Sequence, residues 1–439
     1  MAANTDKATT FGDMLNEYLV YSNILEESFL DQNWLMKTSN KVRTWDGGKL
    51  IVPFQQSTAT SIRMGGLTKE DDIDEATYVR GSISGYKEMY ATLVFNSRDL
   101  FLDHYRISVQ NFLKILPDQI EQLMKYMKQS VSIQVLNGGF LDTVVSGYAG
   151  AVGGAVEVNH PERFVIGGKF FLAEKPLGSS GSFYVTSINK NTGVLTMSAA
   201  RGGSAADFTG YDDTTQIYIP DGQAGGAFSS LRDMLLPDSA GGSDDFAGKV
   251  KLDSPFAQSV LYDAGGVTIN SGDWNHGTIV TGNDILTLIF DALRKGHQRG
   301  AEPECFVMSY LNYSAALLAV EKNSGGFKNT KPAVDYAGYS SITVGGMHGS
   351  VELVGVREMA DDAIFGLKKS HMDFHCGAKF FNILTSPDGL KYYTVRSETG
   401  YKYITDIVLN GDFLYSNPWS AVAIYNIPPI SLPGITGAQ

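Results

Sequence analysis

Two segments of the chain carry apolar residues at steps of three and four. Residues 11–37 place such residues among acidic ones, from Met14 to Phe29. A longer stripe follows Pro117, a residue that favours the first turn of a helix because it has no N–H to leave unpaired there. This spacing predicts an amphipathic N-terminal arm and a long helix over 117–136. The buried face of that helix would hold Ile120, Leu123, Met124, Met127, Val131 and Val135.

Between these two segments the pattern changes to the alternation that is typical of strands. Two strand-like runs, "KLIVPF" and "YKEMYATLVF", flank a polar stretch from Gln55 to Gly85 that holds an acidic tip, Glu70 to Glu75. We expect the two runs to pair as a long hairpin. Because an isolated hairpin has little core of its own, it should project from the body and be stabilised by a neighbour.

A cluster of short alternating runs occupies residues 160–220, among them "RFVIGGKFFLAE", "GSFYVTSINK" and "GVLTMSA". Asn189–Gly193 has the composition of a turn between two of these runs. Glycine-rich stretches at 148–158 and 220–228 bracket the cluster like hinges. The pattern predicts a small β unit inserted in a larger domain.

The last part of the chain mixes both periodicities. A helix is predicted over 284–295 with Asn283 as its N-cap, followed by the strand "ECFVMS" and the helix "YLNYSAALLAVEK". From residue 341 onward most segments alternate as strands do, as far as "NPWSAVAIYNI". No long series of strand–helix–strand units occurs in the sequence, so the predicted class is α+β.

Composition allows a large core and removes several classes of function. Hydrophobic residues make up 43% of the 439 residues and charged ones 19%, below the roughly 25% of ordinary globular chains. The net charge of −12 comes without a Lys/Arg cluster, which argues against tight nucleic-acid binding. Cys305 and Cys376 are too few for a disulfide framework. The polar N-terminus and the short apolar runs predict neither export nor a membrane span.

The stretch "SHMDFHC" gathers side-chain types that bind zinc and other transition metals. On a strand, His371, Asp373 and His375 would share one face, with neighbours on that face roughly 7 Å apart. Metal–ligand bonds of about 2 Å cannot span such a row. The interleaved residues would pack inward: Met372, Phe374 and Cys376. We interpret the stretch as a strand with a polar outer face, and a metal-dependent enzyme using His371, Asp373 and His375 is an alternative.

Other signatures of enzymes fail in this sequence. Gly248-Lys249 lacks the earlier glycine and the following Ser/Thr of a phosphate-binding loop. The segment "GSISG" has Ile83 where a nucleophile elbow needs serine. We predict no catalytic residue, no metal and no cofactor.

The order of parts resembles that of tailed-phage major capsid proteins with the Hong Kong phage-type fold. "KLIVPFQQS…GSISGYKEMYATLVF" resembles their extended loop, and "PDQIEQLMKYMKQSVSIQVLNGG" looks like the spine helix of their peripheral domain. "FYVTSINKNTGVLTMSAA…TQIYIPDG" resembles the β insertion of relatives of podovirus-type coat proteins. "PECFVMSYLNYSAALLAV" and "GDFLYSNPWSAVAIYNI" are similar to an axial-domain strand–helix unit and to the closing strands.

The resemblance implies an α+β Hong Kong phage-type capsid fold that carries an inserted small β-barrel-like domain. The implied boundaries are 1–44 for the N-terminal arm, 45–96 for the extended loop, 97–147 for the peripheral domain with its spine helix, 148–159 for a hinge, 160–222 for the β insertion domain, 223–360 for the axial domain and 361–439 for the return strands of the axial and peripheral domains.

The resemblance also implies a structural protein of the virion, assembled in the host cytoplasm. Hexamers and pentamers would form an icosahedral shell around double-stranded DNA, without sequence-specific binding and without a membrane. Implied partners are other copies of the chain, a separate scaffolding protein, a portal and a decoration protein. Encapsulin compartments share this architecture and are an alternative.

Contact candidates in the extended loop follow from its charges: Arg63, Lys69, Glu70, Asp71, Asp72, Asp74 and Arg80. Some relatives join a loop lysine to an asparagine of a neighbour, a part that Lys69 would take here, although no motif identifies the asparagine. The spine-helix core would consist of Ile120, Leu123, Met127 and Val131.

Overall fold

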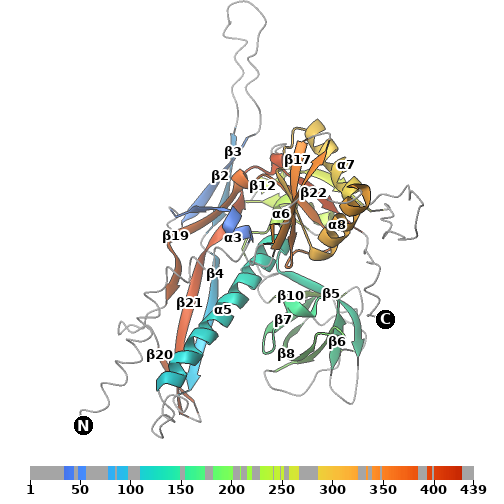
Figure 1. Cartoon of the computed structure of the whole chain (residues 1–439). Coiled ribbons are helices and arrows are strands. Elements are labelled where there is room, and N and C mark those ends of the chain that lie inside the picture. Colours follow the sequence, from blue (N-terminus) through green and yellow to red (C-terminus); the bar gives the residue numbers. More distant parts are fainter. Residues whose placement is uncertain are drawn as a thin grey trace, which may run out of the picture.

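The computed structural model describes most of the chain between Trp34 and Ile427 (Figure 1). The described residues are 34–43, 48–55, 78–84, 87–96, 109–148, 154–173, 181–200, 208, 215–219, 228–240, 242–247, 249–251, 257–265, 285–324, 333–334, 339–346, 349–383, 393–397 and 400–427. Helices and several separate sheets occur in them, which confirms the α+β class.

An elongated sheet is built around one long strand, β21 (Gly400–Tyr415). Strand β4 (Lys87–Asn96) pairs along one edge of β21, while β19 (Met372–Ile383) and β20 (Tyr393–Ser397) pair along its other edge. The short strand β1 (Asn40–Val42) continues the sheet beyond β19 and follows helix α3 (Trp34–Thr38). Distant parts of the sequence therefore meet in this sheet.

Helix α5 (Val109–Asn137) runs diagonally across this sheet (Figure 1). Met124, Met127, Val131 and Val135 join one core cluster with residues of β4, β19 and β21, and these four belong to the predicted apolar stripe. The helix ends at Gly138 and Gly139, which have φ values of +66° and +86°. It begins earlier than predicted, so Pro117 lies inside it and not in its first turn.

A closed barrel follows α5 directly and is drawn in green in Figure 1. Its strands are β5 (Phe140–Tyr148), β6 (Ala155–Val158), β7 (Lys169–Ala173), β8 (Gly181–Asn189), β9 (Val194–Ser198) and β10 (Gln216–Tyr218), closed in the order β10-β5-β6-β9-β8-β7. The barrel begins at Phe140, before the predicted insertion domain of residues 160–222. Strand β6 lies within residues 148–159, which were predicted to be a hinge. Without β5 and β6, strands β9 and β10 would have unpaired edges.

A seven-stranded sheet forms a further unit. Its order is β13 (Val260–Asp263), β22 (Val422–Tyr425), β18 (Ile364–Leu367), β14 (Cys305–Met308), β17 (Gly349–Val356), β16 (Tyr339–Gly346) and β15 (Ala333–Val334). Helices α7 (Ile285–Gln298) and α8 (Tyr310–Ser324) cover one face. The opposite face belongs to the core cluster that also contains residues of α5 and of α6 (Leu231–Leu235).

A two-stranded hairpin, β2 (Lys49–Gln55) with β3 (Tyr78–Ser84), stands at one end of the elongated sheet (Figure 1). The prediction that "KLIVPF" pairs with "YKEMYATLVF" was wrong. The former is β2 and pairs with β3, whereas the latter is β4 and pairs with β21. Strand β4 buries Ala91 and Leu93 against α5, and this larger core decides its partner.

Short elements connect these units. They are the 3-10 turns η3 (Pro161–Arg163), η4 (Asp238–Ala240), η7 (Lys369–His371) and η8 (Pro418–Ser420), and the strand pair β11 (Asp245–Phe246) with β12 (Lys249–Val250). Within the described residues, no helix is both long and apolar enough to cross a membrane.

Candidate functional site

The outer face of the β2–β3 hairpin carries two of the exposed large apolar side chains in the described part of the chain. Side chains alternate along both strands, so Ile51 and Pro53 lie on the same face as Tyr78 and Arg80, across the ladder. Ile51 is 58% exposed and Tyr78 is 61% exposed. Lys49 and Arg80 add positive charge to this face, which we name the hairpin outer face (Lys49, Ile51, Pro53, Tyr78 and Arg80).

The inner face of the same hairpin is fixed to the body. Val52 and Ile83 are buried in the core cluster that contains α5 and the elongated sheet. The backbone N–H of Ser82 donates to the carbonyl oxygen of Ala247 at 2.8 Å. The hairpin is therefore held on one side, while its other side presents apolar and cationic groups outward.

Of the predicted contact residues in the extended loop, Arg80 lies on the hairpin outer face. Six others lie outside the described residues: Arg63, Lys69, Glu70, Asp71, Asp72 and Asp74. In the spine helix, Met127 and Val131 are buried and Leu123 is partly buried against the same cluster. The side chain of Ile120 is outside the described residues.

His371, Asp373 and His375 do not converge on one point. His371 belongs to η7 and not to the predicted strand, which begins at Met372. Asp373 accepts a hydrogen bond from Asn40 Nδ2 at 3.0 Å. Burial lowers the pKa of both histidines, which favours their neutral forms. Among the described residues, no group of three or more His, Cys, Asp or Glu side chains is arranged to hold a metal ion.

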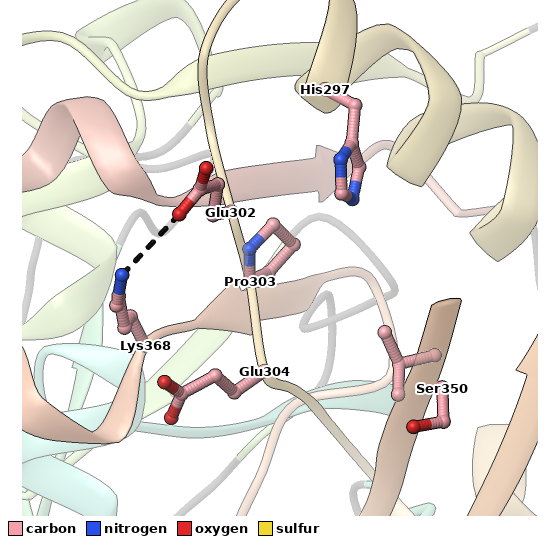
Figure 2. A pocket seen from close by; sticks show the side chains of 7 residues that line it. His297, Glu302, Pro303, Glu304, Ser350 and Lys368 are labelled. Carbon is pink, nitrogen blue, oxygen red and sulfur yellow. Dashed lines mark hydrogen bonds and ion pairs between the residues drawn. The ribbon is translucent and has the colours of Figure 1, made fainter. Parts of the chain in front are cut away.

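A polar hollow of about 280 Å³ lies where α7 leads into β14 (Figure 2). His297, Glu304 and Ser350 line it, and Lys368 forms an ion pair with Glu302 at 3.5 Å across it. The charges of this pair balance each other.

A partly buried charged contact joins the barrel to the loop that connects β17 and β18. His160 lies between two carboxylates: its Nδ1 is 3.1 Å from Glu162 Oε1 and its Nε2 is 2.7 Å from Asp361 Oδ2. Burial lowers the pKa of His160, but the hydrogen bonds to Asp361 and Glu162 outweigh it and raise the pKa to about 9. Sequence reasoning missed this contact because His160 and Asp361 are distant in the chain.

Neither a protein-family model nor a curated protein matches this chain. Among solved structures, the chain is similar to the capsid of a native GTA particle at 9% identity, with a TM-score of 0.42, over 90% of each chain. It is similar to the capsid of cyanophage A-1(L) at 11% identity and a TM-score of 0.40, over 89% of this chain and 91% of that one. It is also similar to the SrpI encapsulin complex of Synechococcus elongatus, at 9% identity and a TM-score of 0.41, over 91% and 89%.

Proposed function

We propose that this chain is a major capsid protein, which assembles with copies of itself into the closed shell of a phage virion. The observation that carries the proposal is the hairpin outer face. A strand pair whose inner side is anchored in the body exposes Ile51 and Tyr78 on its outer side. Exposed apolar groups gathered on one face mark an interaction surface.

The position of this face limits the kind of partner. We propose that this hairpin meets a different surface on the next copy, which makes the contact heterologous. Heterologous contacts that close form rings, which fits the hexamers and pentamers of a shell. One exposed ion pair contributes only about 0–1 kcal/mol, and repetition around each ring makes weak contacts sufficient.

The parts of the chain take corresponding roles in this proposal. The hairpin of β2 and β3 belongs to the extended loop, β4 and α5 belong to the peripheral domain, and residues 223–360 form the axial domain. The charged residues of the loop, Lys69 among them, are further contact candidates. The barrel is the insertion domain, with the earlier start at Phe140. The role of the chain is structural, without a catalytic residue.

The net charge supports enclosure of DNA without tight binding. At −12, the chain is repelled by phosphates on average, so packaged double-stranded DNA would slide against the shell. A scaffolding protein, a portal and a decoration protein are the further partners we propose. The chain would assemble in the host cytoplasm and reside in the virion.

Electron microscopy of the purified full chain at high concentration tests the proposal. We expect rings, shells or tubes, and sedimentation that shifts with concentration. A chain that stays a compact monomer under these conditions would contradict a shell role.

A matched pair of variants tests the surface that carries the proposal. Ile51→Asp with Tyr78→Asp places two charges on the hairpin outer face and should abolish assembled particles while leaving a folded monomer. Ile166→Asp is the control, because Ile166 is similarly exposed, at 62%, but lies in the barrel. Normal particles from the hairpin variant would show that this face is not the contact.

A further inference from the structure

The barrel is attached to the rest of the chain by apolar packing of Ile133 of α5 into its core cluster and, next to η3, by a compact set of charged side chains. His160, between β6 and η3, bridges Glu162 of η3 and Asp361 of the loop 357–362. We name His160, Glu162 and Asp361 the ionic lock. Asp361 comes from the chain segment between β17 and β18, so the lock spans the barrel and the seven-stranded sheet unit.

A buried arginine reinforces the same contact. Arg163 is 3% exposed. Its Nη1 donates to the carbonyl oxygen of Leu141 at 2.7 Å, and its Nη2 donates to that of Met359 at 2.8 Å. One bond thus stays inside the barrel and the other crosses to the loop. Carbonyl partners fix the position of this guanidinium without neutralising it, so nearby carboxylates have to balance its charge.

The charged groups that face His160 come from three elements. Asp142 of β5 accepts a hydrogen bond from the His160 backbone N–H at 2.6 Å. Glu162 and Arg163 of η3, and Asp361 of the loop, face its ring. Burial raises the pKa of Asp361, but its hydrogen bond to His160 outweighs this and lowers the pKa. The imidazolium and the Asp361 carboxylate therefore stabilise each other at neutral pH.

The side of the barrel next to the elongated sheet differs from the locked side. A cleft of about 530 Å³ separates Val165 and residues 167–170 of the barrel from β4 and α5. Tyr90 and Tyr126 line its walls and are exposed. Gln129 of α5 donates to the carbonyl oxygen of Glu162 at 3.3 Å, at the end of the cleft next to the lock. The cleft, which Arg163 also lines, gives the barrel room to move if the lock opens.

The chain connections of the barrel suit such a movement. Gly138 and Gly139, both at positive φ, join α5 to β5. The N–H of Ile219, just after β10, donates to the carbonyl oxygen of Gly139 at 3.0 Å. The chain therefore enters and leaves the barrel at adjacent points, which together can serve as one pivot.

We propose that the ionic lock holds the barrel in one orientation, and that breaking it lets the barrel turn about these two connections across the cleft. The inference concerns a single chain and does not depend on shell formation. It makes the barrel a movable unit whose orientation depends on the His160–Asp361 contact, which acts beside the Arg163 bond to Met359.

Pulsed electron paramagnetic resonance on the full chain tests this proposal. Nitroxides at Tyr126→Cys and Ile166→Cys would report the width of the cleft, since these positions are 40% and 62% exposed and both native cysteines are buried. Labelled chains are diluted with unlabelled ones so that only distances within a chain contribute. We expect one narrow distance distribution with the lock intact, and its loss in His160→Gln and Asp361→Asn.

Two controls separate movement from damage. Lys368→Gln breaks the Lys368–Glu302 ion pair, remote from the barrel, and should leave the distribution narrow. Hydrogen exchange should show that the β8–β9 ladder stays protected in His160→Gln, because the barrel moves as a folded body. An unchanged distribution in both lock variants, or exchange throughout that ladder, would overturn the proposal.

The unmodified lock offers a second measurement if the variants fail to fold. Raising the pH through 9 deprotonates His160 and should broaden the distribution reversibly. Burial lowers the pKa of Lys251 to about 8, so this residue titrates in the same window. Lys251→Met is the control, and its distance distribution should broaden with rising pH as that of the parent chain does. A distribution that stays narrow at pH 10 would refute the lock.

Discussion

The barrel and the β2–β3 hairpin are both all-β units, yet they are stabilised in different ways. The barrel closes on itself around a core cluster in which Leu141, Leu195 and Ile217 are fully buried, and α5 adds only Ile133 to this cluster. The hairpin has two strands and buries one face only, in a core that belongs mostly to other elements. The barrel can therefore keep its shape while its attachment changes, whereas the hairpin depends on what covers each of its faces.

This difference separates two kinds of mutation. Changes in the barrel core should act on local stability, and changes at its attachment should act on orientation. Changes on the inner side of the hairpin should act on its anchoring. Changes on its outer side should act on contacts with other molecules and leave the isolated chain almost unaffected.

The largest expected effect on stability is that of Leu195→Ala in the barrel core. Leu195 of β9 is fully buried, and such a truncation typically costs about 2–5 kcal/mol because it leaves a cavity. Hydrogen exchange should accelerate in β5 to β10 while α7 and α8 keep their protection. Equal acceleration in α7 and α8 would show that the barrel does not form a separate cooperative unit.

His160→Gln should have the next largest effect, and a pH-dependent one. The pKa of His160 is raised from 6.5 to about 9, so its stabilising contribution is full below pH 6.5 and is lost as the pH rises through 9. A tenfold change in proton affinity is worth about 1.4 kcal/mol. Because Glu162 is 38% exposed, solvent screens part of the energy that the raised pKa implies. We therefore expect His160→Gln to lower the free energy of unfolding by about 2 kcal/mol below pH 6.5. Denaturant titrations of both proteins should converge between pH 6.5 and 9.5. A constant difference across this range would contradict the ion pair.

Val52→Ala should weaken the anchoring of the hairpin by about 1–2 kcal/mol, because Val52 is buried and loses two methyl groups. Exchange of the β2–β3 amides should accelerate and that of β8 and β9 should not. The matched substitution Pro53→Ala lies on the exposed outer face and should leave the inner contacts in place. Similar exchange in the two variants would argue that the inner face does not hold the hairpin.

Tyr78→Ser should have the smallest effect on the isolated chain, within about 0.5 kcal/mol, because Tyr78 is mostly exposed. Its effect on assembly should be much larger, seen as fewer particles by electron microscopy at equal protein concentration. A variant that is destabilised by as much as Leu195→Ala would place Tyr78 in a folded core and contradict the comparison.

Local patterns predicted the helical and turn elements best. The stripe from Met124 to Val135 is buried, and Asn189–Gly193 is the turn between β8 and β9. Gly193 has φ +69°, and a side chain there would start 2.3 Å from the Val158 carbonyl oxygen. Spacing of residue types fixes such elements over a few positions, so a single sequence suffices to find them.

Pairings between distant segments were harder to predict. Strand β4 pairs with β21, which is far along the chain, although β2 and β3 are closer in sequence. The start of the barrel at Phe140 depends on β5 pairing with both β6 and β10. The His160–Asp361 contact likewise joins segments that no local pattern relates. Burial of shared cores decides these partners, and alternation alone does not encode it.

The "SHMDFHC" stretch shows both outcomes within a few residues. Met372, Phe374 and Cys376 are fully buried, as the strand alternation predicted. His371 lies in a 3-10 turn, where its backbone N–H donates to Lys368 and Ser416 donates to its carbonyl oxygen. Alternation identified the inward face, whereas the exact start of the strand depends on the contact with Ser416.

The hydrogen bond between Ile219 and Gly139 has a consequence for inheritance. It places the entry and exit of the barrel side by side, and units with adjacent ends are those that chains gain and lose most readily. The coding stretch between these two residues could therefore be gained, exchanged or lost as one unit. The flanking segments would still fold into α5 and α6. Recombination could thus replace the barrel by a different unit, while the packing of the two sheets and α5 continues to restrict the sequence of the rest of the chain.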